Sequence, residues 1–156
     1  MGAVFRWIRD LWLGRRQLGQ TTERATAVVT AAPVPIFTIA GGRIKVTQII
    51  GEVTTVIEAL ATNVRLSGNP TTGTTRNMCA DLNIASYAAG DLLAITGINT
   101  DAMLPPASAG VVEAQTMGVI VQEGTIDLIS DAAPTGSIKW TLKWIPIDEG
   151  AAVVAA

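Results

Sequence analysis

Apolar and polar residues alternate most regularly near the end of the chain, in the stretch SIKWTLKWIPID at residues 137–148. Strict alternation over this many positions is typical of a strand with one buried face and one solvated face. The predicted buried face carries Ile138, Trp140, Leu142 and Trp144, and the other carries Lys139, Thr141 and Lys143. The two tryptophans share a face with aliphatic residues, which favours a core or a subunit interface over a ligand platform.

A second strand-rich region, residues 36–66, is dense in Val, Ile and Thr. Within it, Ile44 and Val46 alternate with charged or polar neighbours, which again indicates one buried face. The pair Gly41-Gly42 separates two β-prone runs and predicts a two-residue hairpin turn. Gly51 predicts a bulge or a bend inside the longer run.

The rest of the chain continues in short runs of the same kind. Residues 76–84 place one set of apolar side chains on one face and Cys79 on the other, unless a bulge intervenes; the set is Met78, Ala80, Leu82 and Ile84. Residues 91–98 predict a strand, and residues 114–131 predict two strands broken at Gln122–Gly124. With about eight strands and little helical pattern, we predict an all-β fold, an antiparallel β-sandwich with the jelly roll as the first option.

Residues 1–13 follow a helical period instead. Their apolar side chains fall on one stripe of a helix, formed by Val4, Phe5, Ile8, Leu11 and Trp12. The charged residues Arg6, Arg9, Asp10 and Arg16 lie mostly off this stripe. Gly14 predicts the end of the helix. Residues 17–35, with Pro33 and Pro35, predict an extended linker. We therefore divide the chain into an arm and linker at residues 1–35 and a sandwich at residues 36–156.

The interrupted hydrophobicity of the arm limits what it can be. Arg6, Arg9 and Asp10 break the apolar run that a signal peptide or a spanning helix needs. Myristoylation is disfavoured because Arg6 stands where Ser or Thr is required. Three alternatives remain: a helix packed on its own domain, an interfacial membrane helix, and an arm that docks onto another subunit. We favour docking, because an isolated helix of this length is only marginally stable in water and orders against a partner surface.

Composition and charge support a chain whose surface meets other subunits. Only 15% of residues are charged and 49% are hydrophobic, whereas ordinary soluble domains carry about 25% charged residues. Residues 1–24 hold five arginines against two acids, a net +3, and residues 25–156 hold six basic and eleven acidic residues, a net −5. A basic arm on an acidic body favours contacts between copies over binding to nucleic acid.

Candidate chemistry is sparse. The chain has no histidine, which excludes histidine-based catalytic pairs and metal ligands. The single cysteine, Cys79, has no candidate base beside it and is expected to be a buried small residue. Two acid pairs could in principle serve a glycosidase, but both adjoin predicted turns and are interpreted as solvated acids: Asp127 with Asp131, and Asp148 with Glu149. We predict no catalytic residue, no metal, no cofactor and no enzymatic activity.

The stretch GGRIKVTQIIGEVTTVIEALATNVRLSGNPTTGTTRNMCADLNI and the closing SIKWTLKWIPID resemble the small structural proteins of tailed bacteriophage virions. Proteins of this type often combine a Gly-Gly hairpin, a long Val/Thr strand, a loop similar to NPTTGT and a short Leu/Cys strand. The resemblance covers residues 36–148 and excludes the arm. It implies a non-enzymatic virion component, commonly a β-sandwich oligomer on the capsid or at the tail.

These observations lead to one favoured function and three alternatives. We expect a capsid decoration or cement protein, a homotrimer bound to the major capsid protein in a virion assembled in the host cytoplasm. Its docking residues would be Val4, Phe5, Ile8, Leu11 and Trp12. The alternatives are a tail or head-fibre component, a carbohydrate-binding sandwich, which needs an exposed aromatic platform, and a peripheral membrane protein.

Overall fold

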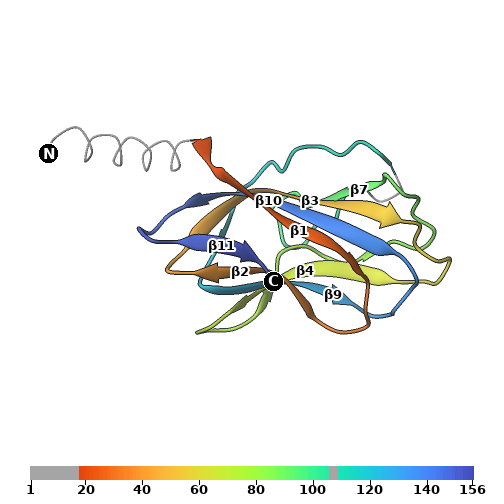
Figure 1. Cartoon of the computed structure of the whole chain (residues 1–156), viewed down its shortest axis with the longest axis horizontal. Coiled ribbons are helices and arrows are strands. Elements are labelled where there is room, and N and C mark those ends of the chain that lie inside the picture. Colours follow the sequence, from red (N-terminus) through yellow and green to blue (C-terminus); the bar gives the residue numbers. More distant parts are fainter. Residues whose placement is uncertain (1–17, 106–108) are drawn as a thin grey trace, which may run out of the picture.

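A computed structural model describes residues 18–105 and 109–156, which form a two-layer antiparallel β-sandwich (Figure 1). The first sheet has the strand order β1 (Gln20–Val28), β10 (Ser137–Pro146), β3 (Ile44–Thr55), with β7 (Leu92–Ala94) and β8 (Val119–Val121) both pairing β3. The second has the order β11 (Ala152–Ala155), β2 (Val34–Ala40), β9 (Gly124–Ser130), β4 (Asn63–Pro70), with β5 (Arg76–Asn77) and β6 (Leu82–Asn83) both pairing β4. The predicted all-β sandwich is confirmed at this level, whereas the predicted helical arm lies outside the described residues.

Strand β10 is one of the two inner strands of the first sheet. Its side chains alternate as predicted, and Trp140 and Trp144 are 1% and 3% exposed. Both tryptophans belong to the buried apolar cluster between the sheets. The indole Nε1 of Trp144 donates a hydrogen bond to Thr22 Oγ1 at 3.0 Å, which satisfies its polar atom. The core alternative for the tryptophans is therefore confirmed.

Gly51 has a packing role. It lies opposite Trp140 in the β3–β10 ladder, and the register irregularities of that ladder occur elsewhere. A Cβ added at Gly51 would lie 2.8 Å from two carbons of the Trp140 ring. The predicted bulge or bend at this glycine is wrong, because the glycine makes room for the indole.

The predicted hairpin at Gly41-Gly42 is also wrong. The strands on either side, β2 and β3, belong to different sheets and do not pair. Both glycines have positive φ, 73° and 134°, so the chain turns sharply from one layer to the other at this point. Beside the turn, Arg43 pairs with Asp148 at 2.7 Å. A glycine pair indicates a tight turn but does not fix which strands pair. Here β2 pairs with β9 and β3 pairs with β10, so the turn joins two strands that do not pair with each other.

Residues 20–28 form β1, although the sequence predicted a linker over residues 17–35. The strand pairs with β10 from Gln20 to Val28. The strand lacks the alternation of apolar and polar residues that predicts a strand, because an edge strand with a solvated face carries charged and hydroxyl side chains. In the described part of the chain, the first strand of the sandwich therefore starts at Gln20, and Pro33 lies in the connection between β1 and β2.

One long side of the sandwich is closed and the other is open. On the closed side, β1 and β11 lie next to each other across the two sheets. Thr22 Oγ1 donates to the Val153 carbonyl at 3.5 Å, and Arg24 Nε donates to the Ala156 carbonyl at 3.1 Å. On the opposite side, short strands form the edges of both sheets: β7 and β8 pair β3, and β5 and β6 pair β4.

Candidate functional site

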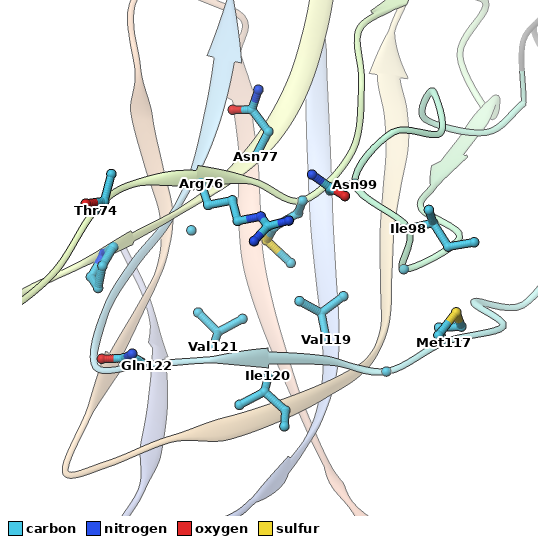
Figure 2. Close-up of a pocket in the computed structure, with 15 residues that line it drawn as sticks. Thr74, Arg76, Asn77, Ile98, Asn99, Met117, Val119, Ile120, Val121 and Gln122 are labelled. Carbon is cyan, nitrogen blue, oxygen red and sulfur yellow. The ribbon is translucent and has the colours of Figure 1, made fainter.

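The open side contains a groove of about 660 Å³ between β8 and the end of β4 with β5. Figure 2 shows Val119 and Val121 pointing from β8 toward Arg76 of β5, whereas Ile120 points the other way. The floor is formed where Val121 approaches Gly68, since a Cβ at Gly68 would lie 3.7 Å from Val121 Cγ1. A groove of this size lies within the range of roughly 300–1,000 Å³ typical of binding pockets.

The groove combines apolar walls with unpaired strand edges. Ile98 and Met117, which line it, are 41% and 54% exposed. Within residues 18–105 and 109–156, β8 pairs only β3 and β5 pairs only β4, so each has an edge without a partner strand. Exposed apolar side chains beside free edges are the features of a docking site for a peptide segment.

Arg76 gives the groove its charge. It is the single charged residue among the described residues that line the groove, and it is exposed. It has no salt bridge to any acid in the described part of the chain. The other polar groups on the rim are neutral, such as Asn99 and Gln122. The groove would therefore accept an apolar segment that brings one acidic side chain to Arg76.

A second candidate surface covers one end of the sandwich, where four connections meet (Figure 1). They are residues 29–33, 56–62, 84–91 and 131–136, and we call this surface the alanine-rich end. Backbone hydrogen bonds join them: Val29 N to Gly136 O, Glu58 N to Thr135 O, and Ile57 N to Tyr87 O. The four connections therefore form one continuous surface.

The alanine-rich end is apolar for an exposed surface. Val56 and Leu60 are 57% and 43% exposed, and Val28 beside them is 63% exposed. Its other exposed apolar residues are small: Ala31, Ala32, Pro33, Ala59, Ala61, Ala88, Ala89 and Ala133. Such small side chains allow a partner backbone to approach closely, and a contiguous apolar patch on a soluble protein marks an interaction site.

The carboxylates of all three acidic residues at this end accept hydrogen bonds from protein groups. Glu58 Oε2 accepts from the Thr135 N–H at 3.1 Å, and Asp91 Oδ2 accepts from the Ala88 N–H at 2.6 Å. Asp131 accepts from the backbone and the side-chain N–H groups of Asn63, both at 2.7 Å. The bonds from Asn63 lower the pKa of Asp131. Because protein groups already bind these carboxylates, covering the surface costs less than covering free acids.

The docking residues predicted from the sequence, Val4, Phe5, Ile8, Leu11 and Trp12, lie outside the described residues. The groove and the alanine-rich end are candidate surfaces for these residues. That these residues dock onto another subunit stays a prediction. The groove itself escaped the sequence analysis. The signal for it was the run GVIV at residues 118–121, which is apolar on both faces although β8 is an edge strand.

The acid pairs do not form paired-carboxylate sites. Asp127 is 5% exposed in the middle of β9, and its Oδ1 has no hydrogen-bond partner among the described residues. The interpretation of Asp127 as a solvated turn acid is therefore wrong. Asp131 lies four residues further on, about 13 Å along an extended chain, beyond the roughly 5–9.5 Å between glycosidase carboxylates. Asp148 is bound by Arg43, and Glu149 is exposed in the turn as expected.

Cys79 is buried, as expected, at 1% exposed. Met78 beside it is buried too, so the regular alternation predicted for residues 76–84 is interrupted between β5 and β6. The thiol accepts a hydrogen bond from the Leu66 N–H at 3.3 Å. Burial away from water raises the pKa of Cys79 to about 11.

We expect Cys79 to be inert in the folded protein. With a pKa of about 11, only about one thiol in a thousand is ionised at mildly alkaline pH, and the thiolate is the reactive form. Native protein mixed with a chromogenic disulfide reagent should show almost no labelling over minutes, whereas protein in denaturant should label fully. Rapid labelling of the native protein would show that this thiol is accessible and activated.

Two further searches concern metals and membranes. Within residues 18–105 and 109–156, no group of three or more Cys, Asp or Glu side chains is arranged to hold a metal ion. No helix in the same part of the chain has the length and apolarity needed to cross a bilayer. The aromatic residues of this part, Phe37, Tyr87, Trp140 and Trp144, are all buried, so none of them forms the exposed platform that a carbohydrate-binding sandwich needs.

Comparisons with known proteins give no relative for this chain. No family model matches its sequence, no curated protein matches it, and no solved structure matches its fold.

Proposed function

We propose that this chain is a non-enzymatic structural protein of a virion, a capsid decoration protein that associates with copies of itself and with the major capsid protein. The observation that carries this proposal is the alanine-rich end, a continuous apolar surface on a domain whose charged groups there are already hydrogen-bonded. In the proposed homotrimer, this end packs the bodies around an axis. The N-terminal arm would extend the contacts to a neighbouring subunit.

The strand order supports a jelly-roll arrangement for the sandwich. The pairs are nested, with β1 on β10, β2 on β9, β3 on β8 and β4 on β5. Nested pairing of this kind is how a jelly roll wraps its strands into two sheets, and β11 adds one further strand beside β2. Jelly rolls occur in viral capsid proteins and also in lectins and cupins, so the fold agrees with the proposal without establishing it.

The alanine-rich end is tested by placing a charge on it. We expect Val56→Glu to weaken self-association of the full-length chain by at least about tenfold, because a carboxylate without a partner would be buried in the interface. Sedimentation velocity over a range of concentrations measures this, with a trimer expected for the unmodified chain. Val154→Glu is the matched control, since Val154 on β11 has nearly the same exposure, 58% against 57% for Val56.

Two results would contradict the proposal. One is equal weakening by both substitutions, which would assign no special role to the alanine-rich end. The other is an unmodified chain that stays monomeric at every concentration. The virion assignment has its own test: an electron-microscopy map of the intact particle should place this chain on the outer surface of the head, and density at the tail or fibres would favour the fibre alternative.

A further inference from the structure

The groove on the open side has the properties of an unfilled docking site. Ile98 and Met117 leave apolar surface exposed on one wall, and β8 and β5 present unpaired edges on either side. The opposite side of the sandwich is closed by β1 and β11, through contacts such as Arg24 to the Ala156 carbonyl. The same fold thus covers one side with its own strands and leaves the other for a segment from elsewhere.

Residues 1–17 match this groove in hydrophobicity. They carry the apolar stripe that includes Phe5, Ile8 and Trp12. This stripe would meet the exposed apolar side chains of the groove.

The ladder registers show that the segment starts within reach of the groove. Gln20 pairs with Trp144, Trp144 with Val46, and Val46 with Val119. The start of β1 is therefore three strand spacings, about 14 Å, from β8. Seventeen residues span about 25 Å even as a helix, so length permits docking on the same body or on a neighbour.

Charge favours the neighbour. A route to the groove of the same chain crosses the solvated face of the first sheet, where Lys143 and Lys45 are exposed. The segment would bring Arg15 and Arg16 over these lysines, which is unfavourable. Between copies, the +3 of the segment and the −5 of residues 25–156 attract each other.

We propose that the groove between β8 and β5 receives residues 1–17 of a second copy of this chain, with the apolar stripe against Ile98, Met117 and Val119. This inference rests on the proposed function, because it names the surface through which the subunits of the assembly exchange their arms. The mode of recognition is a helix in a groove, with the side-chain stripe as its anchor.

Photo-crosslinking of the full-length chain tests the location. One pool carries Phe5→p-benzoylphenylalanine, and a second pool is uniformly ¹⁵N-labelled without the photoprobe. After mixing and irradiation, mass spectrometry identifies the crosslinked peptides. We expect ¹⁵N-labelled peptides from residues 74–78, 98–99 or 117–122, and far fewer crosslinks when the probe replaces Trp7, which lies off the stripe.

The outcomes separate this inference from the proposed function. Labelled crosslinks at the groove support both. Crosslinks confined to unlabelled peptides of the same chain overturn exchange between copies. Labelled crosslinks elsewhere on the body overturn the groove assignment and leave self-association standing. A chain that never associates and never crosslinks to a second copy overturns both.

Discussion

Replacing Trp140 by alanine is expected to lower the free energy of unfolding by about 3–5 kcal/mol, the cost of removing a fully buried large aromatic side chain. Trp140 is the largest of the fully buried side chains among the described residues, at 1% exposed, and it belongs to an inner strand of the first sheet. Domains of this size are stable by only about 5–15 kcal/mol. The substitution therefore removes a large share of the total, which denaturant unfolding at two protein concentrations would measure.

Gly51 provides a control that identifies the cause. A Cβ at this position would lie 2.8 Å from the indole ring, so Gly51→Ala alone is expected to cost about 1–3 kcal/mol through overpacking. In the Trp140→Ala background the added methyl group meets empty space. The double variant should therefore lose less than the sum of the two single losses. Strict additivity would show that Gly51 and Trp140 do not share the packing described above.

Replacing Trp12 by alanine is expected to weaken docking of the arm by about two to three orders of magnitude or more. A large aromatic side chain buried in an interface is worth about 3–5 kcal/mol, and about 1.4 kcal/mol corresponds to a tenfold change in affinity. Trp12 lies on the predicted apolar stripe, whereas Trp7 lies beside it. Sedimentation of the full-length chain should therefore show a strong loss of association for Trp12→Ala and a much smaller loss for Trp7→Ala.

The arginines of the arm distinguish protein docking from membrane binding. With a protein partner, Arg6→Gln and Arg9→Gln should matter little, and mainly at low salt. With a membrane partner, the same changes should strongly reduce binding to vesicles of phosphatidylglycerol and phosphatidylcholine. Vesicle binding that follows the arginines, together with association that is indifferent to Trp12, would move the assignment of the arm to the membrane surface.

Strand pattern determined the fold class and the core of this protein from the sequence alone. The alternation in residues 137–148 predicted the buried face of β10, and that in residues 44–47 predicted the buried Ile44 and Val46. These predictions succeed because strand geometry places successive side chains on opposite faces. A few consecutive residues therefore suffice to show which face of the strand is buried. The burial of Cys79 followed from its small apolar character in the same way.

The tertiary structure alone decided which strands pair, and with them the candidate sites. Gly41 and Gly42 turn the chain between two sheets because β9 and β10 pair with the flanking strands, which are distant in sequence. The polar strand β1 is recognised only by its ladder with β10, and the burial of Asp127 only by its neighbours in the second sheet. The groove exists because two short edge strands end on the same side of the sandwich. Local periodicity indicates which face of a strand is buried. Strand pairing depends on contacts between residues that are distant in sequence, so a local pattern does not predict it.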